Sequence, residues 1–260
     1  MENKYFGCPD QMVEAIAQCV EKLETSCCKN AVGIGVGCPG WVIDGVVYEA
    51  VNLGIKEFNL QKILQQRCRT PVRVENDART ALLCEKKYGA LRSSINGAMI
   101  TFGTGIGGAL LLNGDLYCGS FGHAGEIGHM TIGSKEYFCG CGKWGCYELF
   151  GSVRALIALA RKAGIKADNG EEFFKEVTQE NPVALSCLET YLDQAASGII
   201  EVSMLLDLDT IAIGGAISVQ KERFVSPLEK KVREYCPHCR VVTSAFGNHA
   251  GLIGAALLNQ

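Results

Sequence analysis

Apolar residues recur along the chain with two different spacings, and each spacing predicts a type of secondary structure. Between residues 12 and 23 they fall three or four positions apart, as on the buried face of an amphipathic helix. Short apolar runs typical of buried strands occupy residues 31–36, 46–50, 72–74, 97–102, 109–112, 210–213 and 241–242. Further helices are predicted over residues 60–69, 77–91, 152–205 and 249–258, and again after residue 215. Strands that alternate with helices indicate an α/β protein with a mixed sheet.

Residues 119–151 interrupt this alternation. They are rich in Gly, Cys and His and show little periodicity, and nearly half of the 31 glycines of the chain lie between residues 103 and 151. Glycine at this density is typical of tight turns or of backbone that closely approaches a ligand. We therefore expect the chemistry of the protein in this part of the chain.

Length and charge narrow the class of protein. A chain of 260 residues is long enough for two α/β lobes, expected at residues 1–95 and 96–260. The 25 Lys and Arg residues nearly balance the 28 Asp and Glu residues, and no basic stripe is present, so nucleic acid is not an expected partner. A content of 48% hydrophobic and 20% charged residues excludes a disordered chain.

The cysteine count raises the question of compartment. Residues 1–7 contain no apolar stretch of the kind found in signal peptides, and no apolar run reaches the length of a membrane span. We expect a cytoplasmic, reduced protein without membrane contact, in which most of the 14 cysteines are small buried hydrophobic residues.

Four residues stand at the spacing of metal ligands, namely His129, Cys139, Cys141 and Cys146. Three thiolates and one imidazole suit tetrahedral Zn²⁺, and a filled coordination shell is typical of structural zinc. The alternative is four unrelated buried side chains. Cys236 and Cys239 form a second C-x-x-C pair, for which chance spacing is the favoured interpretation.

Two glycine-rich turns are candidates for contact with phosphate or nucleotide. Gly103, Thr104, Gly105 and Gly107 follow one predicted strand and precede another, and successive backbone N–H groups in such a turn can bind an anion. A structural hairpin is the alternative. Gly214 and Gly215 follow an apolar strand, which allows close approach of a nucleotide or simply a tight turn.

Several polar residues are candidates for contact with a substrate. Asp77 begins a helix directly after a strand and Asn76 precedes it. Asp77 is interpreted either as a helix N-cap or as a base that accepts a proton from a substrate hydroxyl. Glu126, His129 and Glu148 surround the cysteine cluster and are interpreted either as hydrogen-bond partners of sugar hydroxyls or as solvent-exposed charges.

Six stretches together resemble the ROK family of bacterial sugar kinases and sugar-responsive regulators. They are residues 33–40 (GIGVGCPG), 75–78 (ENDA), 103–108 (GTGIGG), 124–129 (AGEIGH), 139–148 (CGCGKWGCYE) and 213–215 (IGG). Their order is that of the family, and they cover nearly the whole chain.

The resemblance implies an actin-like ATPase fold, also called ribonuclease H-like, with two α/β lobes around a cleft. It also implies ATP- and Mg²⁺-dependent phosphorylation of a hexose or N-acyl hexosamine, typically on the 6-hydroxyl, by a homodimer. Asp77 would be the general base, and the sugar would contact Gly40, Trp41, Asn76, Glu126, His129 and Glu148. ATP would contact Gly103, Thr104, Gly105, Gly107, Gly214 and Gly215, and zinc would shape the sugar loop at residues 119–151.

The sequence also departs from the family pattern. No Asp-x-Gly-Gly-Thr run, the family's first phosphate loop, is present, so we expect a truncated N-terminal lobe with an exposed sheet edge. Trp41 and Arg79 differ from the residues usual at those positions. Two alternatives to an active kinase therefore stay open: a catalytically impaired or sugar-sensing protein that binds sugar and zinc, and a purely structural zinc domain.

Overall fold

The structure, a computed structural model, describes residues 6–260. Most of residues 1–7, where no signal peptide is expected, therefore lies outside the described residues. The chain forms two compact units. The first unit comprises Met1–Cys84, Cys118–Ala124 and His249–Gln260, and the second comprises Glu85–Tyr117 and Gly125–Asn248. The chain thus passes between the units several times instead of dividing at one point near residue 95.

The first unit contains two small sheets. Strands β1 (Ile34–Cys38) and β5 (Val72–Asn76) pair in parallel, with Cys38 opposite Asn76. Strands β2 (Trp41–Ile43), β3 (Val46–Ala50) and β4 (Ile55–Phe58) form an antiparallel sheet. Sequence periodicity did not predict β2 and β4, because three or four residues are too few to show an alternation. The parallel pairing brings the segments that follow β1 and β5 to the same edge.

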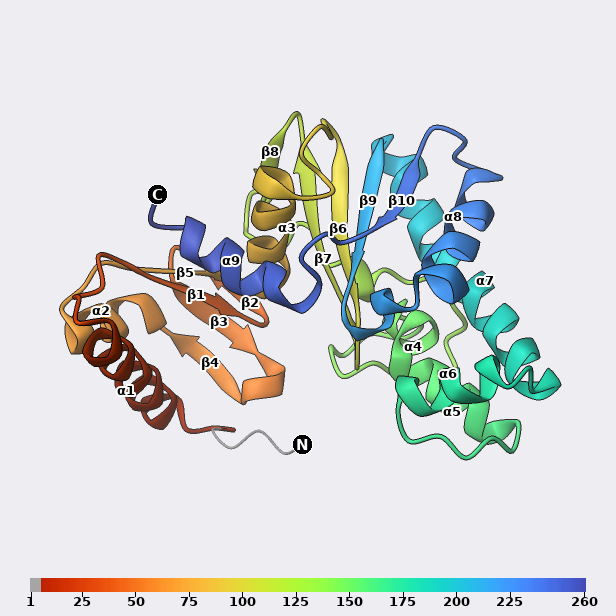
Figure 1. Ribbon diagram of the computed structural model, residues 1–260, viewed down its shortest axis with the longest axis horizontal. Coiled ribbons are helices and arrows are strands. Elements are labelled where there is room, and N and C mark those ends of the chain that lie inside the picture. Colours follow the sequence, from red (N-terminus) through yellow and green to blue (C-terminus); the bar gives the residue numbers. More distant parts are fainter. Residues whose placement is uncertain (1–5) are drawn as a thin grey trace. The chain divides into compact units, whose positions relative to one another are not determined.

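Helices α1 (Pro9–Cys27) and α2 (Leu60–Cys68) lie side by side in the first unit, as Figure 1 shows. Their apolar faces pack on the strands around Val47, Leu60 and Leu64, all fully buried. The guanidinium of Arg67 in α2 bonds the carboxylates of Glu14 and Glu21 in α1. These exposed ion pairs connect two helices that hydrophobic burial already holds together.

Helices α3 (Asp77–Tyr88) and α9 (Ala250–Leu257) approach their neighbours at distances that only glycine permits. A methyl group at Gly35 of β1 would lie 1.8 Å from the carbonyl oxygen of Ala255, and one at Gly254 would lie 1.6 Å from that of Thr80. The glycines of the 33–37 stretch therefore include at least one that serves helix packing in the first unit.

The second unit is built on one mixed sheet with the strand order β10-β9-β6-β7-β8 (Figure 1). Its strands are β6 (Gly97–Phe102), β7 (Ile106–Leu112), β8 (Asp115–Tyr117), β9 (Thr210–Gly214) and β10 (Arg240–Thr243). Strands β6, β9 and β10 run parallel, so β6 and β9 end at the same edge. Strand β7 begins three residues earlier than the apolar run predicted, which shortens the turn after β6 to residues 103–105.

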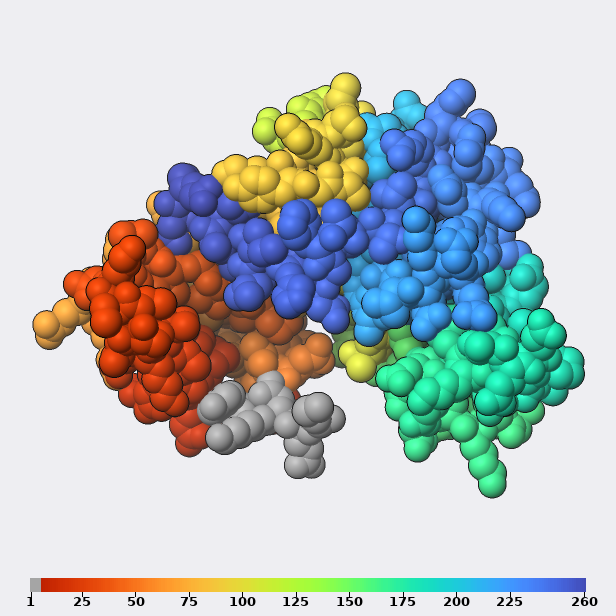
Figure 2. All heavy atoms as spheres, in the orientation of Figure 1, coloured from red at the N-terminus to blue at the C-terminus, as the bar shows by residue number. Residues whose placement is uncertain are grey.

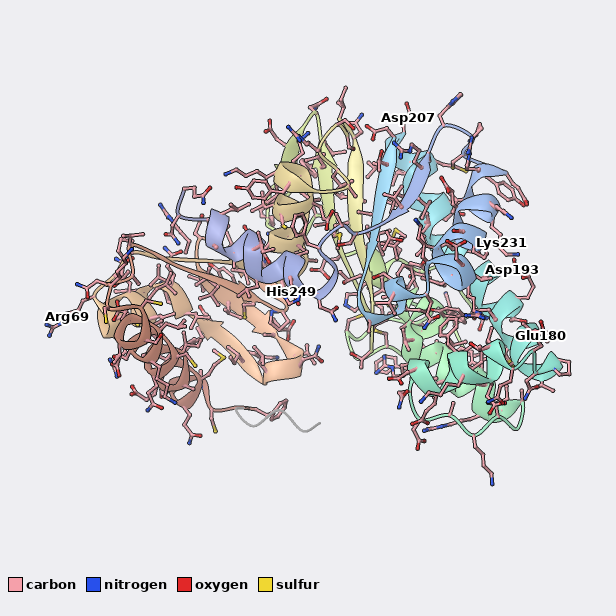
Figure 3. The ribbon with its side chains drawn as sticks, viewed as in Figure 1. Arg69, Glu180, Asp193, Asp207, Lys231 and His249 are labelled. Atoms are coloured by element: carbon pink, nitrogen blue, oxygen red, sulfur yellow. The ribbon has the colours of Figure 1, made fainter. Side chains whose placement is uncertain are left out.

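The helices of the second unit are α4 (Glu148–Gly151), α5 (Val153–Lys162), α6 (Gly170–Thr178), α7 (Pro182–Leu206) and α8 (Ser226–Arg233). The single helical stretch predicted over residues 152–205 is broken at Gly164 and at Glu180, which both adopt positive φ (Glu180 is labelled in Figure 3). In the same view Lys231 of α8 reaches Asp193 of α7, with 2.7 Å between Nζ and the carboxylate. Figure 2 shows residues 153–200, in green to teal, as part of the surface of this unit.

Aromatic rings fill the core between the sheet and α7. Phe102 at the end of β6 lies edge-on to Tyr147 and Phe224, with ring centroids 6.3 and 5.4 Å apart. The Tyr147 hydroxyl donates to the carbonyl of Ala195, and its ring touches Gly198. Since Tyr147 directly follows Cys146, this buried ring anchors one end of the cysteine-rich loop. Among residues 6–260, none of the helices is long and apolar enough to cross a membrane.

Candidate functional site

The junction of β5 and α3 presents Asn76 and Asp77 at the edge where β5 ends. The helix cap is made by Asn76, whose Oδ1 accepts from the backbone N–H groups of Ala78 at 2.9 Å and Arg79 at 3.1 Å. The sequence left open that Asp77 was the N-cap, but Asp77 is the first helical residue. Its carboxylate accepts from the N–H of Ala78 at 2.8 Å, and because the side chain is exposed the carboxylate is available to a substrate.

Asn76 also holds the segment after β1. Its side-chain Nδ2 donates to the carbonyl oxygen of Gly40 at 2.9 Å, and Gly40 has a φ of 98°, which favours glycine. Gly40 therefore lies beside Asn76 in the first unit, and Trp41 directly follows Gly40 in the chain. Because its oxygen and one N–H are already bonded, Asn76 has one amide hydrogen left for a ligand.

The electrostatic environment of Asp77 suits a proton acceptor. Burial by the surrounding chain raises the pKa of its carboxyl above the usual 3.8, against a lowering hydrogen bond from Ala78. The Asp77 side chain nevertheless reaches solvent at the surface of the first unit. Desolvation, with a contribution from the Asp77 charge, raises the pKa of buried Cys38 to about 12, so this thiol is protonated at neutral pH.

In the second unit, Thr104 lies at the tip of the turn between β6 and β7. The N–H of Gly103 donates to the carbonyl of Gly105 at 3.0 Å, so this donor is used within the turn. Within the described part of the chain, the N–H groups of Thr104 and Gly105 have no backbone acceptor. These two groups and the exposed Thr104 hydroxyl are the donors that an anion could meet.

Gly214 and Gly215 lie at the same sheet edge as this turn, since Gly214 pairs with Thr101 of β6. Gly215 has a φ of 83°, and a methyl group there would lie 2.2 Å from the carbonyl oxygen of Phe102. This glycine is therefore required by the backbone itself. The carboxyl ends of parallel strands are the usual ligand-binding edge of α/β sheets, so the arrangement suits a nucleotide.

The four predicted metal ligands come together in the second unit. One donor atom from each of His129, Cys139, Cys141 and Cys146 lies within 4.8 Å of every other. The Sγ atoms of Cys141 and Cys146 are 3.5 Å apart, and Nδ1 of His129 is 3.8 Å from Sγ of Cys139. Tetrahedral zinc with bonds of about 2.3 Å to sulfur requires ligand separations of about 3.8 Å. The donor set and its spacing thus fit structural zinc.

The turns of this loop follow from its glycines. Gly142 and Gly145 have φ values of 85° and 70°. Two backbone hydrogen bonds close the tight turn at residues 139–143: the N–H of Cys139 donates to the carbonyl of Lys143, and the N–H of Gly142 donates to the carbonyl of Cys139. Burial raises the pKa of the Cys139 thiol, which also donates to Oε1 of Glu148 at 3.1 Å. In zinc sites the ligand is the thiolate, whose charge the metal stabilises.

Glu148 and Glu126 lie near this cluster in the second unit. The Glu148 carboxylate is largely buried, and a methyl group at Gly105 would lie 2.4 Å from its Oε2, so the metal loop touches the Thr104 turn. Glu126 is exposed and precedes the short 3-10 turn Ile127–His129. Asn76, Asp77, Gly40 and Trp41 belong to the first unit, whereas Glu126, His129 and Glu148 belong to the second.

Cys236 and Cys239 stay outside this cluster. Cys239 is buried with its thiol 3.7 Å from the Ser203 hydroxyl, and burial raises its pKa to about 11. Among the described residues, only the His129–Cys146 set is grouped as a metal site would be.

Sequence reasoning did not assign Arg79 and His123 to the site. Arg79 is buried behind Asn76, and the ring of His123 lies 4.0 Å from that of Trp41. The acidic Glu75 four positions before Arg79 was the one sequence signal for Arg79, although Glu75 lies in β5 and not on the helix. No local pattern indicated His123, because its ring contacts Trp41, which lies 82 positions earlier in the chain.

Comparison with known proteins defines first the class of protein. The crystal structure of a ROK family glucokinase from Streptomyces griseus in complex with glucose and AMPPNP is similar to this structure, with a TM-score of 0.86 and 30% identity over 96% of this chain and 87% of that chain. The architecture is thus the actin-like ATPase fold that such kinases share.

The pattern of the ROK family matches residues 6–260, and the chain belongs to this family. Glucokinase of Streptomyces coelicolor is 30% identical over 95% of this chain and 86% of its own length. N-acetylmannosamine kinase of Haemophilus influenzae (strain 86-028NP) is 32% identical over 95% of this chain and 83% of its own length. The relatives of this chain therefore include kinases named for two different sugars.

Proposed function

We propose that this protein transfers the γ-phosphoryl group of ATP to a hydroxyl of a hexose or N-acyl hexosamine, typically the 6-hydroxyl. The observation that carries the proposal is the β5–α3 junction, where Asn76 caps the helix and leaves the Asp77 carboxylate available. Kinship with sugar kinases over nearly the whole chain supports the same reading.

In the proposed reaction Asp77 is the general base. Its carboxylate takes the proton of the acceptor hydroxyl, whose oxygen forms a bond to the γ-phosphorus while the bond from that phosphorus to the ADP oxygen breaks. Asn76 contributes its remaining amide hydrogen to a neighbouring hydroxyl. Glu126, His129 and Glu148 are the further residues proposed to contact sugar.

The ATP side of the proposal rests on the second unit. The N–H groups of Thr104 and Gly105 and the Thr104 hydroxyl would bind phosphate oxygens, and Gly214 and Gly215 would border the adenosine. Mg²⁺ carried by ATP would neutralise charge on the phosphates. His129, Cys139, Cys141 and Cys146 would hold a structural zinc that keeps the loop folded.

A second candidate is a protein that binds sugar and zinc without efficient phosphoryl transfer. It is favoured by kinship with a regulator, since a putative xylose repressor of Caldicellulosiruptor is 29% identical over 88% of this chain.

The test is an ATP-coupled assay over a panel of glucose, mannose, N-acetylglucosamine and N-acetylmannosamine, with calorimetry on the same sugars. Turnover of at least one sugar supports the kinase. Heat of binding without turnover supports the second candidate, and no heat with any sugar contradicts both. Sedimentation would test the expected homodimer, and cell fractionation the expected cytoplasmic location.

A further inference from the structure

Arg79 is a buried charge that the proposed reaction does not use. Its side chain is 4% exposed, on the first turn of α3 just behind Asn76 and Asp77. Nη1 pairs at 3.1 Å with the carboxylate of Glu75, which lies near the end of β5. Burying a guanidinium is costly unless its donors are satisfied, so the remaining partners of Arg79 show what the residue does.

Those partners are backbone carbonyls from two other segments of the first unit. Nη1 donates to Val42 of β2 at 3.4 Å, while Nη2 donates to Gly122 at 2.5 Å and to Ala124 at 3.5 Å. Segment 118–124 otherwise has no regular secondary structure. The rigid fork of the guanidinium therefore holds this segment against β2 and α3, which a Lys ammonium could not do with the same geometry.

The held segment also contacts Trp41, which directly follows Gly40 in the chain. The indole Nε1 of Trp41 donates to the carbonyl of Phe121 at 2.9 Å. The rings of His123 and Tyr48 lie 4.0 and 4.8 Å from that of Trp41, at angles of 31° and 30°. His123 is exposed, so its imidazole presents polar edges next to apolar ring surface.

We propose that Arg79 is a positioning residue that docks segment 118–124, and that Trp41 and His123 thereby form a specificity-determining wall for the acceptor sugar. This inference rests on the proposed function. It involves residues of the first unit alone, because Gly40 connects Trp41 to Asn76 through the hydrogen bond from Nδ2. An apolar ring surface with an adjoining imidazole donor suits an acetamido substituent, whose methyl group packs and whose oxygen accepts.

Positioning by Arg79 can be read from Trp41 fluorescence. The chain has two tryptophans, so Trp144→Phe leaves Trp41 as the single reporter. In that background Arg79→Met should raise the acrylamide quenching constant of Trp41 about twofold, and Arg79→Lys should restore it in part. Arg73→Met, an exposed arginine of β5, is the matched control and should leave it unchanged. Unchanged quenching in folded Arg79→Met would overturn the positioning role.

Arg79→Met leaves Glu75 without its partner, which destabilises a protein more than loss of both charges. If that variant does not fold, the double change Arg79→Met and Glu75→Gln removes the unpaired charge and takes its place in the same measurement. Greater exposure of Trp41 in the double variant supports the proposal, and exposure equal to the parent overturns it.

The specificity wall is tested by acceptor ratios. His123→Leu should lower the ratio of kcat/KM for the N-acyl hexosamine to that for the unsubstituted hexose at least fivefold, mainly through KM. His238→Leu, an exposed histidine of the second unit, is the control and should leave the ratio unchanged. A ratio that does not fall in His123→Leu would overturn the wall while the kinase assignment stands.

Failure of the proposed function gives a different pattern. If sugars bind without turnover, the kinase assignment fails, and the same ratio is taken from dissociation constants measured by calorimetry. A fivefold fall in that ratio still supports the wall, and an unchanged ratio overturns it. If no sugar binds to the wild-type protein, the wall is overturned together with the proposed function.

Discussion

The two regions that carry the candidate sugar-binding residues are held in place by different forces. At the β5–α3 junction the backbone of Asn76 and Asp77 is fixed by strand pairing and by a helix cap. The loop at residues 125–148 has one 3-10 turn and two isolated bridges, Thr131 with Cys146 and Phe138 with Trp144. Close glycine contacts and four metal-type donors take the place of regular structure there.

This difference predicts that a substitution can change function without changing stability at the junction, but not in the loop. A side chain at the junction can be replaced while the backbone hydrogen bonds stay, so function should change without a change in fold. In the loop each donor is both local structure and site geometry, so loss of one should affect both.

The largest expected effect is on the junction. Asp77→Asn removes the proposed base, and kcat should fall by about 10²–10⁴ because that is what general base catalysis usually contributes. Sugar affinity and the melting temperature should change little, since the cap belongs to Asn76. Steady-state kinetics with calorimetry measures both, with Asp115→Asn, an exposed aspartate of the second unit, as the control. Turnover that survives would remove Asp77 as the base.

The next effect is on the metal loop. Cys141→Ser should release bound zinc and lower stability by several kcal/mol, at about 2–4 °C of Tm per kcal/mol for domains of this size. Elemental analysis and thermal melts measure this, and a chelator should reproduce it in the wild type. Cys27→Ser, another exposed cysteine, should do neither. Zinc content equal to that of the wild type would contradict the site.

A smaller effect distinguishes glycines within the same loop. A methyl group at Gly128 would lie 2.1 Å from the carbonyl oxygen of Ile106, so Gly128→Ala should cost about 1–3 kcal/mol of unfolding free energy. At Gly140 no atom lies within 4 Å, and Gly140→Ala should stay within about 0.5 kcal/mol. Equal melting temperatures for the two variants would show that the close contact with β7 does not hold the loop.

The smallest effect is a shift in the pH dependence of the junction. Since burial raises the pKa of Asp77 above 3.8 and the base acts unprotonated, kcat/KM should rise with pH through a pKa above that value. The folded state also binds this proton more tightly than the unfolded state. Its contribution to stability is therefore full below 3.8 and declines as pH rises through the folded pKa. An acid limb at or below 3.8 would contradict the shift.

Motifs of consecutive residues allowed the family, the fold and the metal set to be predicted from the sequence. Cys139, Cys141, Cys146 and His129 lie within a stretch of 18 residues (129 through 146), and such ligands are brought together by short turns. The alternation of strands and helices likewise predicted an α/β fold, because periodicity is a local property. Short strands such as β2 and β4 were missed, since their stability comes from pairing.

Only the tertiary structure showed which residues contact one another although they lie far apart in the sequence. Asn and Asp are both common helix N-caps, so the sequence could not decide which of Asn76 and Asp77 caps α3. The backbone geometry decided it, because α3 begins at Asp77 and the Asn76 side chain accepts from the N–H of Ala78. The docking of segment 118–124 by Arg79, and the contact of His123 with Trp41, join residues more than 40 positions apart. Sequence patterns report local preference, whereas a buried charge finds its partners only when distant carbonyls are packed around it.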